Sequence, residues 1–179
     1  MKIKTLSFLL LVILSFTSFS RGQISFNKQR EVEKKQQEET NSTQKQVVKK
    51  TRSKEQEIRR NILETAFEKL NVPYIYGANG NGAYDCSSYV QYVYKHALNI
   101  SLPRVSYQQA ESGKKVSINQ LKAGDLVTFN TLGKSQVSHI GIYIGNGEFI
   151  HASSGSKKVV ISELKGYYAD KFLFGVKII

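Results

Sequence analysis

The stretch HIGIYIGNGEFIH, residues 139–151, predicts a β-hairpin. β-Branched and aromatic residues lie on both sides of residues 145–147, whose sequence GNG is typical of a turn. Residues 125–130 (DLVTFN), 158–162 (KVVIS) and 172–179 (FLFGVKII) have the same strand-like composition. The second half of the chain is therefore expected to form an antiparallel sheet.

The length of the hairpin turn decides which face of the sheet carries two histidines. A two-residue loop at 146–147 would put His139 and His151 on opposite faces, whereas a three-residue loop at 145–147 makes them diagonal neighbours on one face. The three-residue loop also gives the hairpin one consistent apolar face, composed of Ile140, Ile142, Ile144, Ile150 and Ala152. We therefore predict the three-residue loop and neighbouring histidines.

The residues before the sheet predict two main helices. Ser53 and Gln56 fit a capping box that would begin the first helix. Its apolar side chains recur at helical spacing, at Ile58, Ile62, Leu63, Ala66, Phe67 and Leu70. A second helix is expected over residues 86–98, with Asp85 as its N-cap. Helices followed by strands are typical of an α+β domain with an antiparallel sheet.

Residues 1–22 have the pattern of a secretory signal peptide: two lysines, an almost wholly apolar run over 6–16, and small and polar residues. The apolar run is shorter than the roughly 20 residues that a membrane-spanning helix needs. Cleavage near Ser20 or Gly22 and an uncleaved anchor are the two alternatives. No cysteine follows the run, which excludes a lipid attached to an N-terminal cysteine. We expect export, either to the periplasm or to the extracellular space and cell wall.

Residues 23–54 are expected to be a basic, polar linker. The net charge of the chain is +12, and residues 1–60 hold 14 Lys/Arg against 6 Asp/Glu. The linker has too few apolar residues to offset its chain entropy, so we expect it to be disordered or loosely helical. Its charge suits a peripheral contact with an anionic envelope, and a solvated spacer is the simpler alternative. No motif or aromatic interleaving indicates a nucleic-acid partner.

Cys86 is the only cysteine of the chain. Exported proteins that use cysteine structurally usually carry an even number. A single thiol is therefore a buried small residue, an intermolecular link or a nucleophile, and its position in the sequence does not separate the first from the third. At a helix start, free backbone N–H groups favour the thiolate, so we expect a lowered pKa for Cys86. A nucleophile also needs a general base, and histidine is the commonest one.

Three histidines are available as the base. His96 lies at the far end of the cysteine's own helix, roughly 15 Å away, and is not expected to reach the thiol. His139 and His151, as neighbours, fit the arrangement of a base and an orienting group. The alternatives are ordinary sheet histidines or two ligands of a metal. A zinc site would need further ligands at suitable spacing, and none is evident, so we predict no metal.

Four segments together resemble, in order and spacing, the motifs of the NlpC/P60 family of cell-wall cysteine peptidases. They are PYIYGANGNGAYDCSSYVQYVY (73–94), LPRVSYQQ (102–109), LKAGDLVTF (121–129) and VSHIGIYIGNGEFIHAS (137–153). The resemblance covers residues 58–179 and implies that residues 55–179 form a catalytic domain with a papain-like α+β fold. It also implies cleavage of peptide bonds in peptidoglycan stem peptides or cross-links, without a cofactor.

The resemblance implies a catalytic triad of Cys86 as nucleophile, His139 as base and His151 as the polar residue that orients the base. Tyr74 matches the tyrosine of the family's Tyr-x-x-Gly-Gly pattern, whose hydroxyl would help to stabilise the oxyanion. The alternative for Tyr74 is a packing aromatic, and Tyr76 is the neighbour most easily confused with it.

Asp85 and Ser87 match the family's Asp-Cys-Ser motif and are expected to shape the start of the helix. Asp85 is also a candidate for holding substrate. Ser88 stands where the family usually has glycine. Val105 occupies a position at which some members carry an acidic residue that pairs with a free N-terminal amine, which argues against that specificity here.

The function predicted from the sequence is therefore an exported, monomeric cysteine endopeptidase that acts on peptidoglycan peptides. Two alternatives stay open: a related acyl-transfer enzyme, such as an amidase or transacylase, and a catalytically idle module that binds the cell wall.

Overall fold

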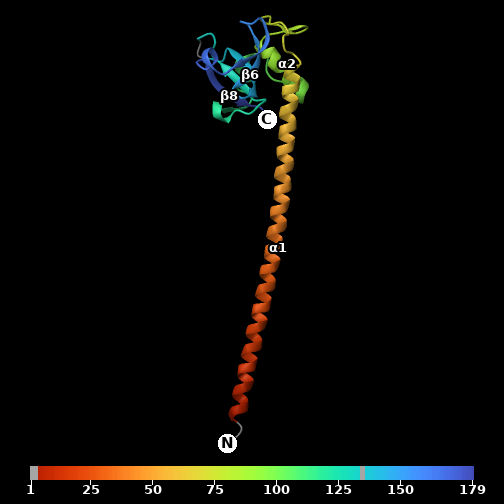
Figure 1. The fold of residues 1–179 in the computed structure, drawn as a ribbon, viewed down its shortest axis with the longest axis vertical. Coiled ribbons are helices and arrows are strands. Elements are labelled where there is room, and N and C mark those ends of the chain that lie inside the picture. Colours follow the sequence, from red (N-terminus) through yellow and green to blue (C-terminus); the bar gives the residue numbers. More distant parts are fainter. Residues whose placement is uncertain (1–3, 134–135) are drawn as a thin grey trace. The chain divides into compact units, whose positions relative to one another are not determined.

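The computed structural model describes residues 4–133 and 136–179 (Figure 1). The chain divides into two compact units, residues 1–53 and residues 54–179. Helix α1 (Lys4–Phe67) contributes to both. Residues 1–3 of the predicted signal peptide lie outside the described residues, and its cleavage stays a prediction. Within the described residues, no helix has the length and apolar character to cross a membrane.

The predicted capping box would begin a helix at Ser53, but helix α1 already runs through this residue. The Ser53 hydroxyl instead donates to the carbonyl of Lys50 at 2.8 Å, a bond made inside a continuous helix. Residues 23–54 also lie within α1, and their side chains from 34 to 54 are all exposed. Gln, Lys and Glu are good helix formers, so a polar stretch rich in them continues a helix without burying a core.

The second unit contains a six-stranded antiparallel sheet with the strand order β3-β8-β4-β5-β6-β7. Its strands are β3 (Lys114–Val116), β4 (Leu126–Phe129), β5 (His139–Gly145), β6 (Glu148–Ser153), β7 (Lys158–Glu163) and β8 (Phe172–Lys177). A two-stranded ribbon precedes them, formed by β1 (Asn79–Gly80) and β2 (Ala83–Tyr84). Besides the end of α1, the helices of this unit are α2 (Cys86–Leu98), α3 (Ser106–Gln109), and the 3₁₀ turns η1 (Ile118–Gln120) and η2 (Gly166–Tyr168).

The β5–β6 hairpin has the predicted register but not the predicted turn. Ile142 pairs with Ile150, while Gly145 pairs with Glu148 across a two-residue loop at 146–147. Both loop residues have positive φ, 53° and 77°, as a type I′ turn requires. A bulge between Tyr143 and Gly145 absorbs the extra residue. The predicted three-residue loop was therefore wrong. The predicted pairing of β5 with β6 was nevertheless right beyond the turn, because the bulge adds the residue that the shorter loop lacks.

The two faces of the sheet carry different cores. The predicted apolar face of the hairpin packs with α2 in one cluster, which includes Ile140, Ile142, Ile150 and Ala152, with Ile144 at its margin. The opposite face carries a smaller aromatic cluster around Phe129 and Phe149. His139 and His151 contact these two aromatic rings, with ring centroids 6.0 and 4.7 Å apart. The register therefore places both histidines on one face.

Candidate active site

The start of α2 is held by a reciprocal capping box around Cys86. One carboxylate oxygen of Asp85 accepts the backbone N–H of Ser88 at 2.8 Å, and the Ser88 hydroxyl accepts the backbone N–H of Asp85 at 2.9 Å. Asp85 is thus the N-cap that the sequence predicted. Ser88, the departure from the family's glycine, supplies the second half of the box. Cys86 is the first residue of the helix.

Arg104, which sequence reasoning did not select, fixes this cap to two other segments. Its guanidinium donates to both carboxylate oxygens of Asp85, at 3.1 and 2.7 Å, to the Ser87 hydroxyl at 2.9 Å and to the carbonyl of Ala78 at 3.0 Å. Burial alone would raise the pKa of Asp85, but the hydrogen bonds from Arg104 and Ser88 outweigh it and lower that pKa. Both oxygens of Asp85 are engaged within the chain, so Asp85 shapes the site and offers little to a substrate.

Replacing Arg104 with alanine is expected to lower the free energy of unfolding by about 1–3 kcal/mol, because Asp85 then keeps a poorly compensated charge. The ion pair is partly exposed, which sets the effect below that of a fully buried pair. Arg104→Lys should recover only part of the loss, since an ammonium lacks the planar fork. Urea unfolding of both variants measures this, and an unchanged midpoint for Arg104→Ala would contradict it.

Tyr74 is partly buried near the cysteine, whereas Tyr76 is exposed. Tyr74 is half-buried at the edge of the core. Burial raises the pKa of the Tyr74 phenol, and the charges of Cys86, Asp85 and Tyr76 raise it further. Tyr76, by contrast, is 89% exposed. The two tyrosines that the sequence left as alternatives therefore differ in burial, and Tyr74 is the one at the edge of the core.

The two histidines of the hairpin are in direct contact. His139 Nε2 lies 2.8 Å from His151 Nδ1, and both imidazoles are buried. Burial lowers the pKa of His139 to about 4, and burial together with the neighbouring His139 lowers the pKa of His151 to about 2. Both rings are therefore neutral at pH 7. When Nε2 of His139 donates to His151 Nδ1, Nδ1 of His139 is the nitrogen left to take a proton.

The pKa of the Cys86 thiol is raised, whereas the helix start had predicted a lowered pKa. Burial raises the pKa of the Cys86 thiol to about 11, and the Asp85 carboxylate adds to the rise. Backbone N–H groups, including that of Ile140, act in the opposite direction but do not outweigh burial. Ile140 follows His139 directly in β5, so the sulfur lies next to the strand end that carries the candidate base. A nucleophile at this position must be generated by proton transfer.

His96 lies apart from this group, as predicted. It is exposed near the end of α2, and its Nδ1 contacts the carbonyl of Tyr92 at 2.8 Å. Within residues 4–133 and 136–179, no group of three or more His, Cys, Asp or Glu side chains is arranged to hold a metal ion.

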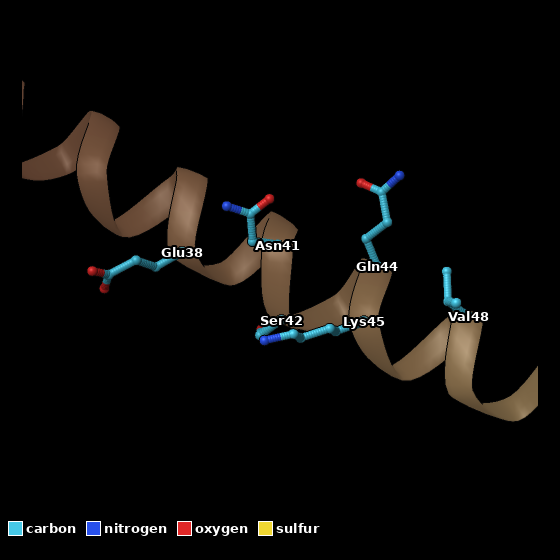
Figure 2. A pocket seen from close by; sticks show the side chains of 6 residues that line it. All are labelled: Glu38, Asn41, Ser42, Gln44, Lys45 and Val48. Atoms are coloured by element: carbon cyan, nitrogen blue, oxygen red, sulfur yellow. The ribbon is translucent and has the colours of Figure 1, made fainter.

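Figure 2 shows a second surface, on the exposed part of α1. The side chains along it are Glu38, Asn41, Ser42, Gln44, Lys45 and Val48. All of them belong to one helix and all are exposed. A ligand site is normally a concavity that buries most of its ligand. Six exposed side chains on a single helix would not bury a ligand in this way, so we assign no site here.

The sequence model of the NlpC/P60 family matches residues 71–178, which include both the capped cysteine and the paired histidines. The chain belongs to the NlpC/P60 family. It is 41% identical over 117 residues to a gamma-DL-glutamyl hydrolase of Bacillus subtilis, covering 65% of this chain and 28% of the relative. It is 34% identical over 116 residues to the murein DD-endopeptidase MepS/murein LD-carboxypeptidase of Escherichia coli, covering 65% and 61%.

Solved NlpC/P60 structures share this fold. The peptidoglycan hydrolase RipB of Mycobacterium tuberculosis superposes with a TM-score of 0.61 at 27% identity, over 72% of this chain and 68% of that one. The predicted papain-like α+β domain of the NlpC/P60 family is thereby confirmed. The chain spans less than two thirds of the length of the two curated relatives. Those relatives have names that describe different bonds, so membership of the family does not by itself define the bond cleaved.

Proposed function

We propose that this protein is a cysteine peptidase that hydrolyses peptide bonds in peptidoglycan stem peptides or cross-links. The observation that carries the proposal is the 2.8 Å contact between His139 Nε2 and His151 Nδ1. If His139 donates from Nε2 in this contact, its Nδ1 is free to act as a base, on the strand that also brings the Ile140 N–H to the Cys86 sulfur. A base held by a third polar group is the arrangement that nucleophilic catalysis needs.

The reaction starts from a neutral pair. As the sulfur of Cys86 attacks the scissile carbonyl carbon, its proton passes to Nδ1 of His139, and the carbonyl π electrons move to the oxygen. The Tyr74 hydroxyl and the Cys86 backbone N–H would stabilise that oxyanion. The imidazolium then protonates the leaving nitrogen as the C–N bond breaks, which leaves a thioester. Water, deprotonated by His139, hydrolyses the thioester and restores the thiol.

Burial of both groups suits this sequence of steps. A thiol with a pKa of about 11 and an imidazole with a pKa of about 4 do not form a standing ion pair at pH 7. The charges would arise only when the substrate closes the site, and the oxyanion donors offset them there. Asp85, Ser87 and Arg104 would hold the helix start in place during the reaction. The proposed chemistry uses no cofactor.

The substrate class comes from the relatives. MepS is named as a murein endopeptidase and RipB as a peptidoglycan hydrolase, and murein peptides are the substrate proposed here. We propose that residues 1–22 direct export and that the basic linker over residues 23–54 makes peripheral contact with the envelope. The protein is proposed to act as a monomer, in the periplasm or outside the cell.

Incubation of the purified full chain with sacculi tests the proposal. Soluble peptides should be released, and each cut should create one new amino and one new carboxyl terminus, which mass analysis identifies. Sedimentation with sacculi without release would support an idle binding module instead. Transfer of an acyl group to another acceptor or to a lipid, without hydrolysis, would support an acyl-transfer enzyme. Either of these outcomes overturns the proposal.

A further inference from the structure

The hydrogen bonds of the histidine pair continue beyond His151. His151 Nε2 lies 3.0 Å from the hydroxyl of Ser162 and 3.5 Å from the hydroxyl of Tyr168. His151 is fully buried, so solvent does not compete for this nitrogen. Of the side chains that face the His151 imidazole, His139 comes from β5, Ser162 from β7 and Tyr168 from η2. Only His139 and Tyr168 among them are titratable.

If His139 acts as the general base, its role decides which atom donates in each of these hydrogen bonds. When His139 has taken a proton on Nδ1, its Nε2 also carries one and must donate to His151. His151 Nδ1 is then an acceptor, so the proton of the neutral His151 sits on Nε2. That N–H is buried and needs an acceptor of its own. Without one, the unsatisfied donor would lower the stability of this tautomer by its desolvation free energy.

Ser162 is placed to be this acceptor. It pairs with Phe149 across β6 and β7, two residues along from the pair of His151 with Val160, so it is a diagonal neighbour of His151 on the same face. The hydroxyls of Ser153 and Ser162 both act on the Tyr168 phenol, and each opposes the rise that burial gives to the pKa of Tyr168. If Ser162 donates its only proton to Tyr168, it turns lone pairs toward His151.

We propose that Ser162 is a positioning residue that accepts the Nε2–H of His151 and so keeps His151 in the tautomer that lets His139 act as a base, with Tyr168 fixing the orientation of the Ser162 hydroxyl. The proposal rests on the proposed role of His139. It extends the hydrogen-bonded pair of His139 and His151 to two further side chains, Ser162 and Tyr168. The pair can otherwise adopt the reverse arrangement, in which both rings carry their proton on Nδ1 and His139 offers no base to the thiol.

Nitrogen-15 NMR of histidine-labelled protein at pH 7 reads these tautomers directly. In the wild-type protein, both buried imidazoles should carry their proton on Nε2. Ser162→Ala should transfer population to the reverse tautomer, and Ser162→Thr, which keeps the hydroxyl in a strand-compatible side chain, should restore the wild-type signals. Tyr168→Phe should shift the population in the same direction as Ser162→Ala, because the Ser162 proton is then free to turn toward His151.

Kinetics on a defined muropeptide gives a second readout. Ser162→Ala should lower kcat about 10-fold with little change in KM, and Ser162→Thr should return it to within about 2-fold of the wild type. Ser154→Ala, in the exposed turn after β6, is the matched control and should change neither readout.

Two results together would show that Ser162 is only a strand residue and that the proposal is wrong. In Ser162→Ala, both imidazoles would still carry their proton on Nε2, and kcat would equal that of Ser162→Thr. The proposal is also wrong if the wild-type His151 carries its proton on Nδ1. Should the wild-type protein cleave no peptidoglycan at all, the NMR measurement still decides the direction of the hydrogen bonds. The proposal and the proposed function therefore fail in distinguishable ways.

Discussion

Replacing Cys86 with alanine is expected to lower the rate of peptidoglycan hydrolysis by about 10⁴-fold or more, because no other described side chain at the site can form the thioester. The effect should fall on kcat, with binding of muropeptides little changed. Release of muropeptides from sacculi, followed by chromatography at matched protein concentration, measures it. Hydrolysis by Cys86→Ala at a rate within 10-fold of the wild type would show that the nucleophile lies elsewhere.

The fold should survive this substitution. The capping box uses the backbone and side chains of Asp85 and Ser88, and the Cys86 side chain takes no part in it. We expect the free energy of unfolding to fall by about 1 kcal/mol, the usual size for a small loss at the core margin. Circular dichroism and urea unfolding would check this. Ser154→Ala, in the exposed turn after β6, serves as the matched control and should retain full activity.

Sequence patterns predicted the parts of the site that depend on local structure and on strand register. Asp85 precedes a helical pattern, and a short polar side chain there accepts the free N–H groups whatever the rest of the fold does. His139 and His151 were placed together by the requirement that the isoleucines of the hairpin share one face. The turn itself was wrong because a bulge and a shorter loop give the same register as a longer loop without a bulge.

Side-chain contacts between segments far apart in the chain could not be predicted from the sequence. Arg104 is 19 positions from Asp85, and nothing in its own surroundings shows that the two side chains meet. Ser162 lies in a strand pattern in which a single serine has no distinguishing feature. The thiol pKa was wrong for a similar reason. The helix start is visible in the sequence and favours the thiolate, whereas burial by other elements is not visible and raises the pKa of Cys86.

The burial of two neutral histidines predicts a loss of stability in mild acid. The unfolded chain binds protons at both histidines as the pH falls through about 6.5. In the folded protein, His139 binds its second proton only near pH 4 and His151 only near pH 2. Between pH 6.5 and 4 the unfolded state therefore binds more protons, and the free energy of unfolding must fall as the pH falls.

Each histidine contributes about 1.4 kcal/mol per pH unit across this window, so His139 alone accounts for a loss of roughly 3 kcal/mol between pH 6.5 and 4. Asp85 and Glu55 have lowered pKa values and lose their stabilising effect only in stronger acid. The interval from pH 6.5 to 5 therefore isolates the histidines. Urea unfolding at half-unit steps of pH should show the slope.

Variants assign the slope to the buried pair. His151→Gln removes one of the two buried titrating rings, and it should flatten the dependence between pH 6.5 and 5 even if it lowers stability at pH 7. His96→Gln removes an exposed ring and is the matched control, which should keep the wild-type slope. A wild-type stability that is flat from pH 7 to 5 would mean that His139 and His151 take up protons while folded. In that case the neutral pair from which the proposed reaction starts would not be the resting state of the site.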